Sequence, residues 1–293
     1  MTEAPTVLFC VGATKAGTSW LYRHLSQHPD CHLRSIKELH YFDMIELGTH
    51  RRFRTRLRER IALLKSAVAA GDARPAQHRQ LRDALEWKAV IASDTVDAPA
   101  YLGYLSEGRG TKRLVADITP AYALLPEARL RQMAAIAPQT RFLYALRDPV
   151  ARLWSQARML ASRRSEGQGD LAALAAQMLE GMLEAIRKGL PDREDYIGAV
   201  TRLRNAIAPD RLLIQLYDDL MSPAGLSRLQ GFLGIADVPG EFDRRVHEGA
   251  ALVMPDDLRA RAQVALRPQY EFAAKLFPDL PASWRKNMTE VHG

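Results

Sequence analysis

The sequence predicts an α/β fold: a three-layer domain with a parallel central sheet. Apolar, β-branched runs recur along the chain and helix-like stretches separate them, an alternation typical of parallel sheets. The first run leads into a glycine-containing turn and then a helix, a P-loop-like strand-turn-helix. The expected strands lie at 6–12, 113–119, 141–148 and 211–219. Because parallel strands are covered on both faces, near-continuous apolar runs such as "FLYAL" are typical of central strands.

The 293 residues, 47% of them hydrophobic, are enough to bury a substantial core. No Gly/Ser-rich or Pro-rich linker divides the chain, so we expect a single domain over 1–293. Amphipathic spacing predicts helical additions around 51–95 and 160–190, and a further helix at 256–278. Ser222 followed by Pro223 is a typical helix start.

The net charge of +7 and pI near 9.5 indicate an anionic partner or an arginine-rich surface, without separating nucleic acid, lipid and nucleotide. The arginines between 51 and 60 fall on several faces of a helix, which favours a solvated helix. We therefore expect no nucleic-acid partner, and a basic nucleic-acid-binding protein is kept as an alternative.

The two cysteines, Cys10 and Cys31, make neither a disulfide framework nor a metal-ligand cluster. The apolar run near the N-terminus is too short for a signal peptide, and no later segment resembles a membrane span. We expect a cytoplasmic protein without a membrane span.

The turn "GATKAGTS" lies between the first strand and the helix that begins at Thr18. A strand-turn-helix gathers free backbone N–H groups and the positive end of a helix dipole, which is an anion site. Gly12 and Gly17 are expected to let the backbone approach the anion, and Lys15 is the only full charge in the loop. In a nucleoside-triphosphatase loop the lysine directly precedes the hydroxyl residue. Here Gly17 takes that place, so Lys15 is expected to project from the crest of the turn. Taken alone, the loop could also be an ordinary glycine-containing turn.

A second phosphate site is predicted at the same edge of the sheet. Arg147 follows the strand at 141–148 and offers a planar fork for phosphate, and Ser155 lies two turns into the helix that Pro149 starts. The alternative is that Asp148 caps the helix while Arg147 pairs with a carboxylate.

The segment "KELHYFD", residues 37–43, is a candidate acid-base site. Glu38 lies between cationic residues that keep it ionised, so it could accept a proton, and His40 could donate or accept nearby. A surface turn with charge pairs is the alternative for this segment alone.

Together these segments resemble the sulfotransferases that use 3′-phosphoadenosine 5′-phosphosulfate (PAPS), in particular their bacterial and carbohydrate-type branches. "ADITPAY" and "YDDLMSPAGLSRLQGFLGI" are similar to the later E-x-T-P-x-Y and Y-E-D-L…F-L-G-[IL] segments of these branches. The resemblance implies a sulfotransferase-like P-loop fold. It also implies cofactor-binding residues in the K-x-G-T-[TS] loop, in the adenine-stacking tryptophan after it and in the 3′-phosphate segment: Lys15, Ala16, Gly17, Thr18, Ser19, Trp20, Arg147 and Ser155. Trp20 could equally be core packing.

The implied reaction moves a sulfuryl group from PAPS to a hydroxyl or amine of a small-molecule, lipid or glycan acceptor, with adenosine 3′,5′-bisphosphate (PAP) as product and no metal. Glu38 would be the base, Lys15 would stabilise the leaving phosphate, and His40 would position the acceptor or the sulfuryl oxygens.

Two departures restrict the comparison with that family. Ile118 stands where heparan-type members carry lysine, which disfavours a heparan-like acceptor. The C-terminal loop that closes over the nucleotide is missing, and "SWRKN", with Arg285 and Lys286, is its nearest substitute.

The closest rival function is a P-loop kinase acting on a small molecule with ATP and magnesium. Asp218 and Asp219, at the end of the last predicted strand, would then hold the metal, although the early lysine disfavours this. His24, His28 and His32 follow helical spacing, and we interpret His28, which precedes Pro29, as structural. The sequence identifies neither the acceptor nor the oligomeric state.

Overall fold

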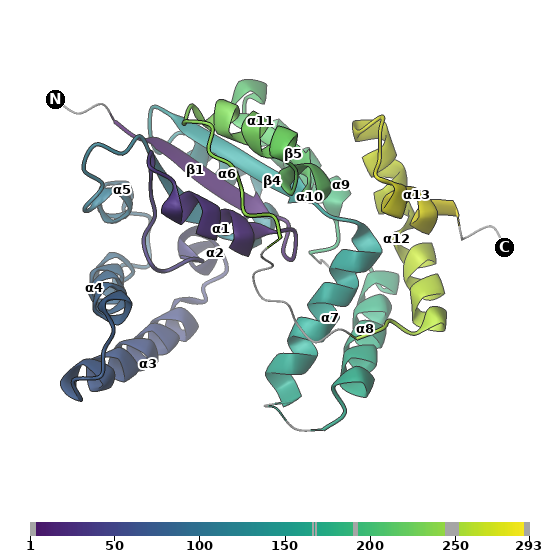
Figure 1. The fold of residues 1–293 in the computed structure, drawn as a ribbon, viewed down its shortest axis with the longest axis horizontal. Helices are drawn as coiled ribbons and strands as arrows, with labels where there is room; N and C mark the ends of the chain where they lie inside the picture. Colours follow the sequence, from purple (N-terminus) through teal and green to yellow (C-terminus); the bar gives the residue numbers. More distant parts are fainter. Residues whose placement is uncertain (1–3, 166, 168, 190–192, 244–251, 290–293) are drawn as a thin grey trace.

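The computed structural model describes residues 4–289 except 166, 168, 190–192 and 244–251. Its centre is a five-stranded, all-parallel sheet in the order β2-β3-β1-β4-β5, with helices on both faces (Figure 1). The three-layer α/β fold is therefore as predicted. The strands are β1 Thr6–Gly12, β2 Cys31–His32, β3 Leu114–Ile118, β4 Thr140–Leu146 and β5 Leu212–Leu216.

Thirteen α-helices lie in the described ranges, together with the 3-10 turns η1 Pro120–Leu124 and η2 Pro209–Arg211. The helices are α1 Thr18–Gln27, α2 Tyr41–Glu46, α3 His50–Ala69, α4 Pro75–Val90, α5 Ala98–Ser106, α6 Glu127–Ala134, α7 Pro149–Ser165, α8 Leu171–Arg187, α9 Tyr196–Ala206, α10 Tyr217–Leu220, α11 Pro223–Leu233, α12 Asp256–Leu276 and α13 Ala282–Thr289.

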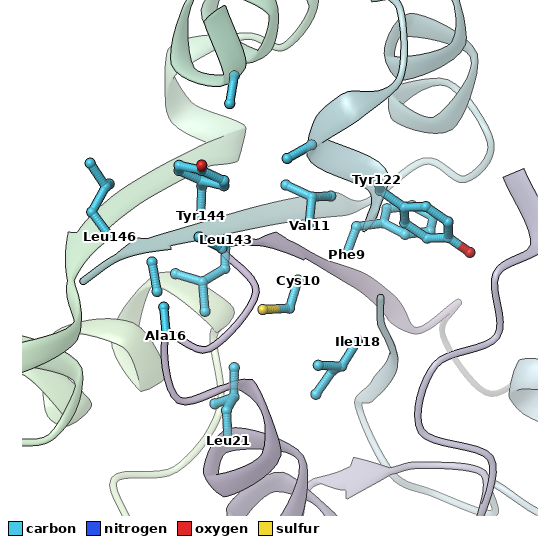
Figure 2. Close-up of a cluster of buried hydrophobic side chains, with 14 of the residues drawn as sticks. Phe9, Cys10, Val11, Ala16, Leu21, Ile118, Tyr122, Leu143, Tyr144 and Leu146 are labelled. Carbon is cyan, nitrogen blue, oxygen red and sulfur yellow. The ribbon is translucent and has the colours of Figure 1, made fainter. Parts of the chain in front are cut away.

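The core lies on both faces of β1 and β4, as their continuous apolar runs require. Figure 2 shows Cys10 and Leu143 on the face that α1 covers, and Val11 and Tyr144 on the opposite face; all four side chains are at most 1% exposed. Alternate side chains of a strand point to opposite faces, so every position of such a strand is buried.

One predicted strand is too long, and one short strand was not predicted. The expected strand 211–219 ends at Leu216, because Tyr217–Leu220 forms a helical turn whose two acidic residues favour a helix N-terminus. The short strand β2 was not predicted, since two residues carry no periodic pattern; it pairs with the start of β3.

The segment 51–95 folds as the α3–α4 hairpin, which projects from the sheet edge in Figure 1. A buried ion pair between Arg34 and Asp83, at 3.0 Å, fixes α4 beside the edge strand β2. The segment 160–190 contains the end of α7 and all of α8; residues 166, 168 and 190 lie outside the described residues.

Gly12 has a packing role that the sequence analysis did not predict, and the approach of its backbone to an anion stays a prediction. A Cβ atom at this position would collide with the Tyr144 ring of the neighbouring strand, so the glycine serves the packing of β1 against β4. Gly17 has a φ of 83°, a left-handed conformation that glycine adopts without strain.

Candidate active site

The phosphate loop follows β1 at the carboxyl edge of the sheet and ends at α1. Gly17 is the N-cap of α1; no side chain caps this helix, and its first turn contains no acidic residue. The N–H groups of this turn therefore keep their capacity to bind an anion. Lys15 lies at the crest with a φ of 68°.

Several cations surround Lys15. Burial lowers the pKa of its ammonium group, and repulsion from Arg147, Lys37, Arg158 and, more weakly, Arg163 lowers it further. Lys37 comes from the segment before α2, Arg147 from the position directly after β4, and Arg158 and Arg163 from α7. A bound anion would relieve the repulsion, so this electrostatic pattern fits a multiply charged ligand.

Arg147 and Arg152 hold the back of the loop. Arg147 Nη1 donates to the Lys15 carbonyl oxygen at 3.0 Å, and Arg152 Nη1 donates to the Thr14 carbonyl oxygen at 3.4 Å. Arg152 is 1% exposed and also forms an ion pair with Glu194. The two guanidinium groups therefore satisfy the carbonyl oxygens of consecutive loop residues, Thr14 and Lys15.

The alternative for Arg147 and Asp148 was that Asp148 caps the helix while Arg147 pairs with a carboxylate. The Asp148 carboxylate does cap α7, since it accepts the Ala151 N–H at 2.7 Å. Arg147 instead lies against the loop, and its guanidinium carbon is 5.1 Å from the centroid of the Tyr217 ring. Ser155 is 8% exposed on the same helix, two turns after Arg147.

Asp148 also anchors the C-terminal helices. Its Oδ2 accepts hydrogen bonds from the Tyr270 hydroxyl and the Asn287 amide, each at 2.9 Å. The segment "SWRKN" is thereby fixed behind the strand end that carries Arg147. Arg285 donates to the Leu280 carbonyl oxygen within its own segment, at 2.7 Å.

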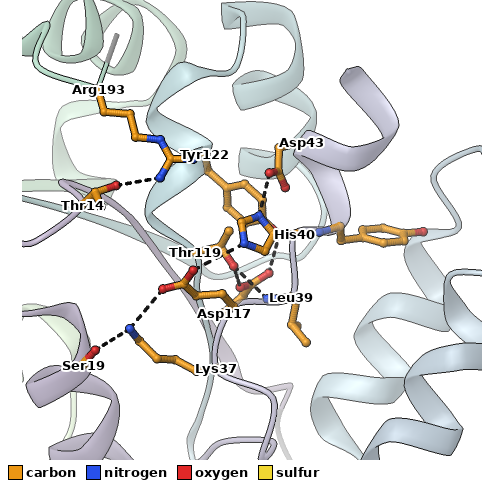
Figure 3. A network of polar contacts seen from close by, with 12 residues as sticks. Thr14, Ser19, Lys37, Leu39, His40, Asp43, Asp117, Thr119, Tyr122 and Arg193 are labelled. Atoms are coloured by element: carbon orange, nitrogen blue, oxygen red, sulfur yellow. Dashed lines mark hydrogen bonds and ion pairs between the residues drawn. The ribbon is translucent and has the colours of Figure 1, made fainter. Parts of the chain in front are cut away.

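Lys37 connects the phosphate loop to the predicted base. Its Nζ donates to the Ser19 hydroxyl at 2.7 Å and to Glu38 Oε1 at 3.2 Å (Figure 3). The sequence analysis treated Lys37 only as a charge that keeps Glu38 ionised, without a contact to the phosphate loop. Its position next to Glu38 was visible, but the contact with Ser19 joins residues 18 positions apart.

Glu38, His40 and Asp43 form a row of charged side chains in which His40 contacts both carboxylates. His40 Nε2 is 3.4 Å from Glu38 Oε2, and its Nδ1 is 2.7 Å from Asp43 Oδ2. Partial burial would raise the pKa of Glu38, but hydrogen bonding to His40 and the charge of Lys37 outweigh burial and hold it at about 2. Burial would lower the pKa of His40, and bonding to the two carboxylates raises it to about 9.

These pKa values give Glu38 and His40 different charges and therefore different roles. At neutral pH Glu38 is an anion and His40 is an imidazolium that donates from both nitrogens. Glu38 can therefore accept a proton, while His40 orients Glu38. Asp43, which the sequence analysis did not single out, orients His40 in turn.

Trp20 packs within the fold. Its side chain is 6% exposed, its indole N–H donates to the Glu241 carbonyl oxygen at 2.9 Å, and it stacks on Phe242 and His24. The predicted stacking on adenine stays a prediction. His28 is structural as interpreted: it is 1% exposed, and its ring bonds to the Ala236 carbonyl oxygen at 2.9 Å.

The carboxylates of the rival metal site are used elsewhere. Asp218 Oδ2 accepts the Trp284 indole N–H at 3.2 Å, and Asp219 pairs with Arg228 at 3.6 Å. Within the described ranges, no three His, Cys, Asp or Glu side chains are grouped so that they could hold a metal ion.

The arginine-rich helix α3 forms no compact basic site. Arg54 donates to the carbonyl oxygens that follow α4, at Ile91, Ala92 and Ser93, and to the Asp94 carboxylate. The other arginines between 51 and 60 are exposed. Over the described part of the chain, no helix is both long enough and apolar enough to cross a membrane.

The fold and the loop define a P-loop-like α/β protein in which an uncapped helix, α1, begins at the carboxyl edge of the sheet. A model of the sulfotransferase family matches residues 5–237, so the chain belongs to the sulfotransferase family. No match was found among curated proteins.

Two solved structures are among the matches, and the first of them shows the similarity of fold. A sulfotransferase from Alicyclobacillus acidocaldarius is 20% identical, with a TM-score of 0.61 and coverage of 97% of this chain and 100% of that one. The sulfotransferase domain of the Synechococcus PCC 7002 olefin synthase is 17% identical, with a TM-score of 0.49 and coverage of 95% and 97%.

Proposed function

We propose that this protein transfers the sulfuryl group of PAPS to a hydroxyl or amine of a small-molecule, lipid or glycan acceptor and releases PAP. The observation that carries the proposal is the link from Ser19 through Lys37 to Glu38. It brings an anion-binding helix N-terminus and an ionised carboxylate to the two sides of one ammonium group. Sulfuryl transfer needs these two functions side by side, since one binds the donor and the other deprotonates the acceptor.

The residues present fit a nucleotide with phosphate groups at both ends of its ribose. The uncapped first turn of α1, with Thr18 and Ser19, would hold the 5′-phosphosulfate, and Arg147 and Ser155 would hold the 3′-phosphate. Arg158, three residues after Ser155 on α7, adds positive charge on this side of Lys15. Bound PAPS supplies an activated S–O bond.

Lys15 would stabilise the negative charge that grows on the phosphate oxygen as this bond breaks. Glu38 would take the proton of the acceptor hydroxyl. Its low pKa makes it a weak base, but after the new S–O bond has formed the acceptor oxygen is positively charged, and its proton is then strongly acidic. A weak base is sufficient for this late proton transfer. His40 would hold Glu38 and contact the acceptor or the sulfuryl oxygens.

The proposal is tested by calorimetric titration with PAP and, as a control, with ATP, each with and without magnesium. We expect binding of PAP and no comparable binding of ATP. A preference for magnesium-ATP would contradict the proposal and favour the kinase. Acceptors are then screened by following ³⁵S from labelled PAPS into a panel of phenols, sugars and lipids with free hydroxyl groups.

A further inference from the structure

A buried polar cluster lies behind the proposed catalytic segment 38–41 and takes no part in the reaction described above. At its centre is Asp117, near the carboxyl end of β3, which is 1% exposed. Its carboxylate accepts hydrogen bonds from three hydroxyls, those of Thr119 at 2.6 Å, Tyr101 at 2.6 Å and Tyr122 at 2.8 Å.

Two of these hydroxyls also reach the catalytic segment. The Thr119 hydroxyl accepts the backbone N–H of Leu39, and the Tyr122 hydroxyl accepts that of Tyr41, each at 3.0 Å. These are the two amides that flank His40. Figure 3 shows Asp117, Thr119 and Tyr122 close to His40 and Leu39.

His40 needs such support because its backbone is strained. Its φ of 54° lies in the left-handed region, which residues other than glycine adopt at a cost and keep only when their surroundings hold them there. A relaxed backbone would rotate the imidazole away from Glu38 and Asp43, which it contacts at 3.4 and 2.7 Å.

Asp117 makes the support directional. A hydroxyl has one proton and can rotate, so by itself it can face an amide with either its proton or a lone pair. Donation to Asp117 fixes the protons of Thr119 and Tyr122, and their lone pairs then face the two amides. A buried carboxylate is costly to maintain. Burial raises the pKa of Asp117 to about 6 against the opposing effect of the three hydroxyls.

We propose that Asp117 is a positioning residue that acts through Thr119 and Tyr122 to hold His40, and with it Glu38, in working geometry. The hydrogen bonds that run from Asp117 through Thr119 and Tyr122 to the amides of Leu39 and Tyr41 form a clamp on His40. The role of this clamp in catalysis rests on the proposed function. The clamp itself is a property of the fold and can be tested separately.

The chain offers a matched pair of variants for the test. Tyr122→Phe and Tyr101→Phe each remove one hydroxyl that donates to Asp117, and both tyrosines are 0% exposed. Only the Tyr122 hydroxyl also accepts an N–H from the catalytic segment. A merely structural role for the cluster predicts similar effects of the two variants.

The readout is the titration of the His40 imidazole by ¹H–¹⁵N NMR, with the resonance assigned by its loss in His40→Asn. The titratable groups that act on this ring are Glu38 and Asp43 beside it and Asp117 behind it. We expect Tyr122→Phe to lower the proton affinity of His40 at least roughly tenfold, and Tyr101→Phe to leave it within about twofold of wild type. Asp117→Asn should behave like Tyr122→Phe.

Equal changes in the two tyrosine variants, or none in Tyr122→Phe, would overturn the proposal. PAP titration of the same proteins separates this result from the proposed function. If wild type does not bind PAP, the proposed function fails while the NMR comparison still decides whether the clamp exists. If all variants bind PAP equally, a loss of PAPS turnover confined to Tyr122→Phe and Asp117→Asn supports the catalytic role of the clamp.

Discussion

The Lys37 ammonium group lies 2.7 Å from the Ser19 hydroxyl, and through this contact the proposed base segment is joined to the first turn of α1. Lys37 also contacts Glu38 at 3.2 Å. An anion bound at the helix N-terminus would compete with Glu38 for the charge of Lys37. If the proposed function holds, binding of the donor is coupled to the basicity of Glu38.

Glu38→Gln should abolish most of the transfer while nucleotide binding is retained, because the carboxylate acts on the acceptor. We expect turnover of the best acceptor of the panel to fall roughly 10²- to 10⁴-fold, the range for loss of a general base. PAP affinity, measured by calorimetry, should stay within about twofold of wild type. Glu46→Gln, which removes a carboxylate paired with Arg129 at 2.9 Å, is the control. Parallel loss of PAP binding would make Glu38 structural.

Lys15→Met keeps the length of the side chain and removes its charge. Turnover should fall roughly 10²- to 10³-fold, the scale for losing one preorganised group that stabilises a developing charge. Circular dichroism should show a folded protein, since the Lys15 contact with Arg147 uses the backbone carbonyl. Lys65→Met, at an exposed position of α3, is the matched control. Unchanged turnover would contradict the role of Lys15.

Arg147→Ala should weaken binding of PAP much more than binding of 5′-AMP, which lacks the 3′-phosphate. Loss of a charged hydrogen-bonding partner predicts a roughly ten- to hundredfold weaker Kd for PAP. The 5′-AMP titration reports whether the loop stays intact without the bond to Lys15. Arg113→Ala, at an exposed arginine, serves as the control. If Arg147→Ala weakens binding of PAP and of 5′-AMP equally, Arg147 supports the loop and does not bind the 3′-phosphate.

His40 should contribute stability that depends on pH. Its folded-state pKa of about 9 is above the ordinary value of 6.5, so this stability is fully present below pH 6.5 and is lost as the pH rises through 9. His40→Asn retains a residue that tolerates the left-handed backbone. Urea unfolding at pH 6 should show wild type more stable than the variant by at most roughly 3 kcal/mol. A gap that does not shrink by pH 9.5 would contradict the raised pKa.

Gly12→Ala should destabilise the protein by roughly 1–3 kcal/mol, the usual cost of overpacking, because the added Cβ meets the Tyr144 ring. A second substitution, Tyr144→Val, removes that ring and should recover part of the loss in the double variant. Thermal unfolding of the two single variants and the double variant measures the coupling. Strictly additive losses would show that the two residues do not interact.

The sequence predicted the fold class and the candidate segments because their signals are local. The apolar run of β1, the glycine turn after it and the helix start at Thr18 are each written in a few consecutive residues. The existence of β2 depends on pairing with the distant strand β3, and local patterns missed it. The end of β5 was missed because the apolar run does not show where the helical turn Tyr217–Leu220 begins.

The sequence by itself determined which chemical groups the protein carries and their order along the chain. Only the tertiary structure decided which of them meet. The sheet order places β1 between β3 and β4, so the loop after β1 meets Arg147 from one neighbour, and the segment at 39–41 meets Asp117 and its hydroxyl partners from the other. These contacts join residues about 80 to 130 positions apart, because parallel strands bring distant carboxyl ends to one edge.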